Sequence, residues 1–294
     1  MNPAVEAMLT RYSRRSVDDH VNALREVLQE IALCGLWRGK FFERAAFYGG
    51  SALRVLHGLE RFSEDLDFSL LAPDPRFDFG RYLAAVELEL RAFGFDLSAE
   101  VKEKGARRAV STAFLKATTR ELLLSVGAGE ALAGIVPAGQ RLKIKVEVDT
   151  DPPGRFATET RFCLQPVPFS VRSFALPSLF AGKMHALLCR GWRDRVKGRD
   201  WYDFVWYVTR GTPLNLAHLE ARMRQSGHLP DASALDAGAF HALLTKRIDT
   251  LDVGQARADV ERFVAARSSL DAWSRELFHA VAARIEIEPE EKRP

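Results

Sequence analysis

Residues 47–70 read FYGGSALRVLHGLERFSEDLDFSL, and the predicted fold depends on this stretch. It opens with the aromatic pair at 47–48, followed by two glycines at 49–50 and a short helical segment at 51–57. An alternating segment at 65–71 comes next and is typical of a half-buried strand. The stretch therefore predicts a strand, a glycine turn, a helix, a turn and a second strand, in that order.

The rest of the chain divides into a part rich in strands and a part that is helical. Apolar spacing predicts helices at 16–36 and 79–93, and strands at 95–103, 109–117, 121–126 and 142–149. From residue 177 onward the spacing is helical, near 177–190, 199–209, 214–226, 236–250, 254–267 and 271–284. We therefore predict an α+β fold, with a mixed-sheet domain over 1–170 followed by an all-helical domain over 171–294.

The composition is that of an ordinary globular protein. Hydrophobic residues make up 47% and charged residues 28% of the 294 residues, which excludes disordered and coiled-coil classes. Because no apolar run has the length of a membrane helix and the N-terminus does not resemble a secretory signal, we expect a cytoplasmic protein without a membrane partner. Cys34, Cys163 and Cys189 fit neither a disulfide framework nor a zinc motif and are expected to be buried thiols. The histidines, His57 and His185 among them, show no ligand spacing and are expected to be structural or at the surface.

Two carboxylates lie on one face of the strand predicted at 65–71. Side chains alternate along a strand, so Asp65 and Asp67 point the same way, opposite to Leu66 and Phe68. A divalent cation with a preference for oxygen ligands, Mg²⁺ or Mn²⁺, would relieve the repulsion of such a pair. An acidic strand exposed to solvent is the simpler interpretation of the pair taken alone.

The glycine turn before this strand is suited to binding phosphate. Gly50 and Ser51 begin the short helix, where backbone N–H groups and the helix dipole favour an anion, and Ser51 is expected to cap the helix and contact a phosphate oxygen. A capped turn without a ligand is the alternative. Together with Asp65 and Asp67, the turn predicts a triphosphate site facing a pair of metal ions.

A third carboxylate is available on the strand predicted at 142–149. Lys143, Lys145, Glu147 and Asp149 share one face of this strand. Two-metal phosphoryl transfer requires such a carboxylate, and Glu147 is the first choice and Asp149 the second. A solvated polar face is the alternative interpretation.

The helices near 177–190 and 199–209 add a lysine and two acids. Asp200 and Asp203 lie together on a face away from the apolar stripe, with Arg199 beside them. Lys183 borders the apolar stripe of the preceding helix, so that its ammonium group could reach a triphosphate. The alternative is a salt bridge that fastens the two helices. We expect Asp200 in such a bridge and Asp203 in the active site.

Four segments together resemble a known family. The stretch at 47–70 looks like the first motif of the AbiEii/AbiGii-type nucleotidyltransferase toxins, a branch of the DNA polymerase β-like nucleotidyltransferase superfamily. KIKVEV at 143–148, AGKMHALLCR at 181–190 and RDWYDFVWYV at 199–208 are similar to the family's strand motif, lysine helix and RDxxD helix. The four segments occur in the family's order and span 47–208.

The resemblance implies the reaction and the role of each site residue. It implies a toxin of a type IV toxin–antitoxin system that transfers a nucleoside monophosphate from an NTP to the 3′ acceptor end of tRNA with Mg²⁺, opposed by an antitoxin encoded alongside. The implied metal ligands are Asp65, Asp67, Glu147 and Asp149. The implied nucleotide-binding residues are Gly49, Gly50, Ser51, Lys183 and Arg199. The implied catalytic residues are Asp65, Asp67, Glu147, Lys183 and Asp203.

Two basic clusters are candidates for contacts with RNA. The first contains Lys102, Lys104, Arg107 and Arg108, and the second runs from Lys183 to Arg199 with Trp192 and Trp201 interleaved. Basic residues bind phosphates and tryptophans can stack on bases, so the second cluster is the predicted RNA track. Three other functions stay open: a nucleotidyltransferase with a protein or small-molecule acceptor, a non-catalytic RNA- or protein-binding module, and a metal-dependent nuclease.

Overall fold

The computed structural model of the chain describes residues 2–102, 110–127, 130–137, 139–190, 196–264 and 267–289. These residues form two compact units, each assembled from several stretches of sequence. Unit 1 comprises Met1–Gly58, Ser63–Pro152 and Thr160–Ser173, whereas unit 2 comprises Leu59–Phe62, Pro153–Glu159 and Phe174–Pro294. The main change of unit falls after Ser173, and two short segments from earlier in the chain belong to unit 2.

A mixed sheet organises the strand-rich part of the chain. The described residues form seven strands in the order β3-β4-β5-β2-β1-β7-β6. The strands are β1 (Ala45–Tyr48), β2 (Leu66–Leu70), β3 (Ser98–Lys102), β4 (Val110–Thr118), β5 (Arg141–Asp149), β6 (Thr158–Cys163) and β7 (Phe169–Phe174). Strand β2 pairs antiparallel with β1 and parallel with β5. The strand that carries Asp67 therefore lies in the interior of the sheet.

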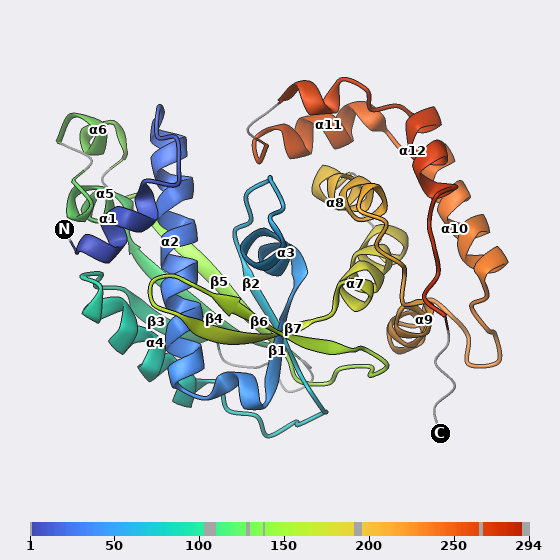
Figure 1. Cartoon of the computed structure of the whole chain (residues 1–294), viewed down its shortest axis with the longest axis horizontal. Helices are drawn as coiled ribbons and strands as arrows, with labels where there is room; N and C mark the ends of the chain where they lie inside the picture. Colours follow the sequence, from blue (N-terminus) through green and yellow to red (C-terminus); the bar gives the residue numbers. More distant parts are fainter. Residues whose placement is uncertain are drawn as a thin grey trace. The chain divides into compact units, whose positions relative to one another are not determined.

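Helices of unit 1 pack against one another and against the sheet (Figure 1). They are α1 (Pro3–Leu9), α2 (Val17–Arg38), α3 (Gly49–His57), α4 (Gly80–Ala92), α5 (Thr119–Ser125) and α6 (Glu130–Ile135), with a short 3-10 turn, η1 (Phe41–Glu43). Gly35 lets α2 approach α4 closely, because a Cβ there would lie 2.8 Å from the Cα of Val86. The ring of Phe41 meets Phe68 of β2 and Tyr82 of α4 edge-on, each with a centroid distance of 5.0 Å. An aromatic core thus joins β2 to the helices.

Unit 2 is mainly helical. Its helices are α7 (Leu176–Cys189), α8 (Gly198–Thr209), α9 (Leu216–Gln225), α10 (Ala237–Asp249), α11 (Val253–Glu261) and α12 (Arg275–Ala282), with a 3-10 turn, η2 (Arg267–Leu270). Helix α8 packs against α7, α11 and α12. Trp201 of α8 lies 4.8 Å from Phe278 of α12, centroid to centroid, and is only 3% exposed. The apolar stripe predicted for α8 is therefore the core of this unit.

Two parts of the sheet region differ from the prediction. The strand predicted at 121–126 is wrong, since these residues belong to helix α5 and the turn after it. Leu122 and Leu123 are both buried while Leu124 is 42% exposed, and two adjacent inward side chains fit a helix rather than an alternating strand. Strands β6 and β7 were not predicted. In β7 the alternation of buried and half-buried side chains is short, with the half-buried polar residues Ser170 and Arg172 on either side of the buried Val171.

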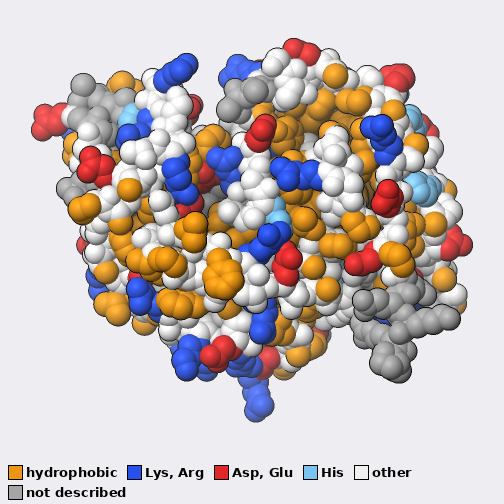
Figure 2. All heavy atoms as spheres, viewed as in Figure 1, with side chains coloured by type: hydrophobic (Ala, Val, Ile, Leu, Met, Phe, Trp, Pro, Cys, Tyr) orange, Lys and Arg blue, Asp and Glu red, His pale blue; other side chains and the backbone are white. Residues whose placement is uncertain are grey.

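The surface agrees with the composition. No helix in the described part of the chain is both long and apolar enough to cross a membrane. Acidic and basic side chains are interspersed on the face shown in Figure 2. Cys34, Cys163 and Cys189 are free and buried, which confirms the prediction that they are buried thiols.

Candidate functional site

The first turn of α3 lies directly against the carboxylate of Asp67. Gly49 adopts a positive φ of 81°, a conformation that L side chains rarely adopt. A Cβ at Gly49 would lie 2.6 Å from Oδ2 of Asp67, which is closer than any side chain allows. The second glycine, Gly50, continues the same turn of helix. The glycine turn and the acidic strand, predicted from separate patterns, therefore meet in unit 1.

Ser51 does not have the position that was predicted for it. Helix α3 begins at Gly49 and its N-cap residue is Tyr48, so Ser51 lies inside the first turn and is not the cap. The hydroxyl of Ser51 is fully buried and donates a hydrogen bond to the backbone carbonyl of Asp65. Ser51 therefore fastens α3 to the residue that precedes β2, and any phosphate contact at this turn falls to backbone N–H groups.

Asp65 and Asp67 are both half-buried at the start of β2. Asp65 immediately precedes the strand and Asp67 is its second residue. Leu66 and Phe68, which alternate with them, are fully buried. The predicted division of this segment into an apolar face and an acidic face is confirmed by this burial pattern.

Glu147 is the neighbour of Asp67 across the sheet. In the parallel pairing of β2 with β5, Glu147 lies beside Asp67 and Asp149 lies beside Ser69. Oε2 of Glu147 is 2.6 Å from Nζ of Lys145, and Oε1 is 3.5 Å from the hydroxyl of Thr112 on β4. The carboxylate of Glu147 is therefore engaged by Thr112 on β4 and by Lys145 on its own strand.

Asp149 closes a turn at the end of β5. Its Oδ1 accepts a hydrogen bond of 3.0 Å from the backbone N–H of Asp151. Within the described residues, the carboxylates of Asp65, Asp67, Glu147 and Asp149 do not form a cluster of three with all ligand atoms within 4.8 Å. Glu147, and not Asp149, is therefore the acid of β5 that lies beside Asp67.

In unit 2, Lys183 bridges α7 and α8. Its Nζ lies 2.7 Å from Oδ1 of Asp200 and 2.7 Å from Oδ2 of Asp203. Lys183 is 12% exposed, and the two aspartates are 5% and 0% exposed. The sequence predicts different roles for the two aspartates, but in the structure both form an ion pair with Lys183. The salt bridge between helices, considered as the alternative, is present.

Arg61 completes this cluster and was missed by the sequence analysis. Its Nε and one terminal nitrogen each lie 2.6 Å from a carboxylate oxygen of Asp203, in a bidentate ion pair. Arg61 belongs to Leu59–Phe62, the loop segment that joins unit 2. Since Arg61 and Asp203 are 142 residues apart, no local pattern could pair them. The one available signal was an arginine inside the first family motif.

In this cluster, nearby positive charges offset the effect of burial on the pKa values of the two aspartates. Burial raises the pKa of Asp203, but the charges of Arg61 and Lys183 outweigh this effect and hold the pKa below its ordinary value. Burial likewise raises the pKa of Asp200, and Lys183 with other nearby cations lowers it further than burial raises it. Lys197, next to α8, has its pKa lowered to about 8, mainly by burial. Both aspartates are therefore ionised at neutral pH.

The predicted RNA track is only partly described. The guanidinium of Arg199 lies over the ring of Phe263 at 4.2 Å. Trp201 is buried in the core of unit 2, so its prediction as a stacking surface is wrong. Residues 191–195, with Trp192, lie outside the described residues, as do Lys104, Arg107 and Arg108 of the first basic cluster.

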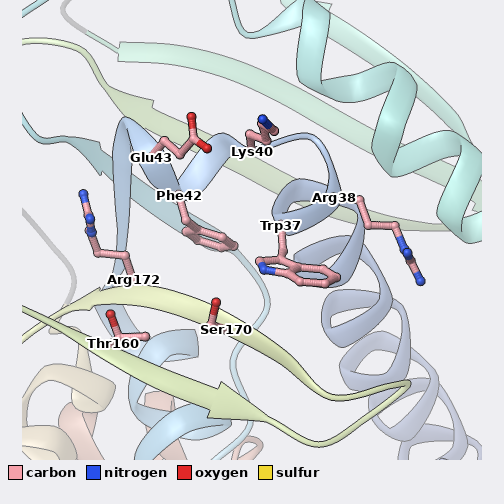
Figure 3. Close-up of a pocket in the computed structure, with 8 residues that line it drawn as sticks. All are labelled: Trp37, Arg38, Lys40, Phe42, Glu43, Thr160, Ser170 and Arg172. Carbon is pink, nitrogen blue, oxygen red and sulfur yellow. The ribbon is translucent and has the colours of Figure 1, made fainter.

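A pocket of about 600 Å³ lies elsewhere in unit 1 (Figure 3). Trp37 and Phe42 form an aromatic wall, and Trp37 is 36% exposed. Lys40 and Arg172 also line the pocket, and neither makes an ion pair with another described residue. The pocket lies beside the start of β1, whereas Asp67 pairs with Tyr48 at the end of that strand. It is therefore a feature separate from the carboxylates.

Comparison with known proteins assigns the chain to a family. Residues 31–281 match the family described as "Nucleotidyl transferase AbiEii toxin, Type IV TA system". The chain therefore belongs to the AbiEii nucleotidyltransferase toxin family, and it is an enzyme of the nucleotidyltransferase type whose family works with a cognate antitoxin.

A solved structure supports the fold. JHP933 from Helicobacter pylori has a TM-score of 0.52 at 16% identity, covering 88% of this chain and 89% of that one. A putative nucleotidyltransferase from H. pylori has a TM-score of 0.46 at 14% identity, covering 86% of this chain and 90% of that one. No curated protein sequence matches the chain.

Proposed function

We propose that the protein transfers a nucleoside monophosphate from an NTP to the 3′ acceptor end of tRNA, in a reaction that depends on Mg²⁺ and blocks translation in the cytoplasm. The observation that carries the proposal is the contact between Gly49 and Asp67. It brings a helix N-terminus, which suits phosphate, next to a carboxylate, which suits a divalent cation. Donor phosphates and metal ligands must be adjacent in this chemistry.

The residues of unit 1 fit a divalent cation. Asp65 and Asp67 flank the buried Leu66 where β2 begins, and the absence of a side chain at Gly49 lets the first turn of α3 approach the Asp67 carboxylate more closely than a Cβ would permit. Asp65 and Asp67 would hold Mg²⁺, or Mn²⁺ in its place, with Glu147 as the third acid. When bound, the cation neutralises charge on the triphosphate and lowers the pKa of the attacking hydroxyl.

The chain's own groups orient the donor. Backbone N–H groups at the first turn of α3, around Gly49 and Gly50, would bind phosphate oxygens of the NTP. In unit 2 we assign triphosphate binding to Lys183, whose ammonium is paired with Asp200 and Asp203 and whose side chain is 12% exposed. Asp203 acts as a positioning residue, because its carboxylate is fully buried between Arg61 and Lys183. Arg199 is the further candidate for contact with the nucleotide.

The acceptor strand requires a surface with cations and an aromatic ring. With Trp201 buried, the pocket of Trp37, Lys40 and Arg172 is one described surface that combines both. Aromatic rings stack on bases and cations bind phosphodiesters, which supports an RNA contact at this pocket. We expect Trp37→Ala to weaken RNA modification while the binding of NTP is unchanged.

The test is incubation of the purified protein with bulk tRNA, Mg²⁺ and each α-labelled NTP in turn. Asp67→Asn and Lys183→Ala should abolish labelling, whereas the matched surface control Asp96→Asn, whose side chain is 95% exposed, should not. Label in RNA that is lost in the first two variants supports the proposal. Label in a protein or small molecule would show that the acceptor is not tRNA. Shortened RNA without label would indicate a nuclease. Cellular toxicity that survives Asp67→Asn would indicate a binding module.

A further inference from the structure

A cluster of metal-ligating side chains lies in unit 2 and has no part in the proposed reaction. His185, Cys189 and His228 each offer one ligand atom, and these three atoms lie within 4.8 Å of one another. We propose that this His–Cys cluster binds one divalent transition-metal ion, with Zn²⁺ as the best match, at a site separate from the carboxylates of unit 1. The expectation that the histidines and cysteines have no ligand spacing would then be wrong.

Helix geometry fixes two of the three ligands. His185 and Cys189 are four residues apart in α7, so they lie one turn apart on the same face of the helix. His185 is half-buried and Cys189 is 7% exposed. Helical spacing of this kind is a common way to present two ligands to one ion. The sequence pattern is short and has no second half nearby, so the sequence alone does not identify a metal site.

The third ligand is held by the end of α9. Gly227 has a φ of 73° and ends the helix, with its N–H bonded to the carbonyl of Arg224 at 2.9 Å. The N–H of His228 bonds to the carbonyl of Met223 at 2.8 Å. These two hydrogen bonds are those of a Schellman motif, which defines where the following residue lies. The backbone of His228 is therefore rigidly placed although its side chain is exposed.

Ser226 marks the point where the two imidazoles converge. Its hydroxyl oxygen is 2.8 Å from Nε2 of His185 and 2.9 Å from Nδ1 of His228. Two ring nitrogens that reach one oxygen atom can also reach one metal ion placed near it. The exposed side of His228 leaves a path by which an ion could enter.

The ligand set selects the class of metal. A thiolate and two imidazoles suit Zn²⁺ and related transition metals, whereas Mg²⁺ prefers carboxylate and water oxygens. Three protein ligands leave a fourth position of a tetrahedral ion for water or the Ser226 hydroxyl. Burial and the charges of Arg222, His228 and Arg190 lower the pKa of His185 to about 4. The guanidinium groups of Arg222 and Arg190 oppose an additional cation, and the thiolate that Cys189 would form on binding the metal would offset part of that opposition.

A bound ion would link α7 to the end of α9. Helix α7 also carries Lys183, two residues before His185. We therefore expect the ion to stabilise unit 2 and not to take part in nucleotidyl transfer. Its removal should lower the melting temperature of the protein, whereas Asp67→Asn should leave the binding of Zn²⁺ unchanged.

The test uses the full chain after treatment with a chelator. Titration with Zn²⁺ against a chromophoric chelator should give one site per chain, and Co²⁺ should produce a thiolate-to-metal charge-transfer band. Cys189→Ser and His228→Ala should each weaken Zn²⁺ binding by at least about 100-fold, since even partners outside the ligand set contribute 10- to 100-fold. The matched controls Cys163→Ser, at a buried cysteine in unit 1, and His279→Ala, at a histidine paired with Asp249, should bind as the parent does.

The results separate this proposal from the proposed function. Absence of the Co²⁺ charge-transfer band, or Zn²⁺ binding unchanged in both ligand variants, would overturn the metal site. His228 is exposed, so His228→Ala should fold even if Cys189→Ser does not. A nucleotidyltransferase assay with Mg²⁺ alone tests the other proposal independently, because that activity does not require the His–Cys cluster.

Discussion

Substitution Arg61→Met should destabilise unit 2 strongly. Arg61 is 3% exposed and makes two hydrogen bonds of 2.6 Å to Asp203, whose side chain is fully buried. Without Arg61, the Asp203 carboxylate keeps only Lys183, which it shares with Asp200. Loss of one partner from a buried ion pair costs about 3–5 kcal/mol, because the remaining charge is left poorly compensated in a low-dielectric environment.

Urea unfolding followed by tryptophan fluorescence measures this loss. With a slope of about 3 kcal/mol per M, the expected loss lowers the unfolding midpoint by roughly 1 M or more. The matched control is Arg257→Met, because Arg257 pairs with Asp271 at 2.9 Å with both side chains well exposed. That change should cost less than about 1 kcal/mol.

A double variant tests the reason for the loss. Arg61→Met combined with Asp203→Leu removes both charges, so it should recover much of the stability lost in Arg61→Met alone. The reasoning would be refuted if Arg61→Met cost no more than Arg257→Met. It would also be refuted if the double variant were less stable by the full sum of its two single changes.

Three further predictions concern glycine packing and pH. Gly49→Ala should lower the free energy of unfolding by about 1–2 kcal/mol, because residue 49 has a positive φ. It should also reduce nucleotidyl transfer by roughly 100-fold, since the added Cβ displaces the Asp67 carboxylate. Activity equal to that of the parent in labelled-NTP assays would contradict this. Gly198→Ala should cost about 3 kcal/mol in urea unfolding, because its Cβ would lie 1.8 Å from the carbonyl oxygen of Ala256. Burial lowers the pKa of His218 to about 3, so the folded protein keeps this imidazole neutral. The free energy of unfolding therefore receives the full contribution of His218 above the ordinary pKa of 6.5. As the pH falls from 6.5 towards 3, that free energy decreases by up to about 1.4 kcal/mol per pH unit. His218→Gln should flatten stability measured over that pH range.

Local patterns were sufficient to predict the elements that carry the site. The run at 47–70 predicted β1, α3 and β2, because glycine turns and alternation are local properties. The register of β2 and β5, which makes Glu147 and not Asp149 the neighbour of Asp67, depends on pairing between distant strands. Strict alternation in the strand at 142–149 identified the face, but not the register.

Other features could not be predicted because they depend on contacts made after folding. Ser51 was a reasonable helix cap, yet Gly49 starts the helix earlier and leaves Ser51 buried. Trp201 is the exception, because its place on the apolar stripe of its own helix is a local signal for the core, which the prediction of a stacking surface disregarded. The pairing of Arg61 with Asp203 joins a loop to a distant helix and has no local signature.

The interleaving of the two units has a consequence for synthesis of the chain. Leu59–Phe62 is made early, yet its packing partners in unit 2 begin mainly at Phe174. During translation, the buried ion pair between Arg61 and Asp203 cannot form until residue 203 has been synthesised. A nascent chain can therefore hold all of the carboxylates of unit 1 while unit 2 is still unfolded. Any activity that requires Lys183 in its folded setting begins only after about two thirds of the chain has been translated.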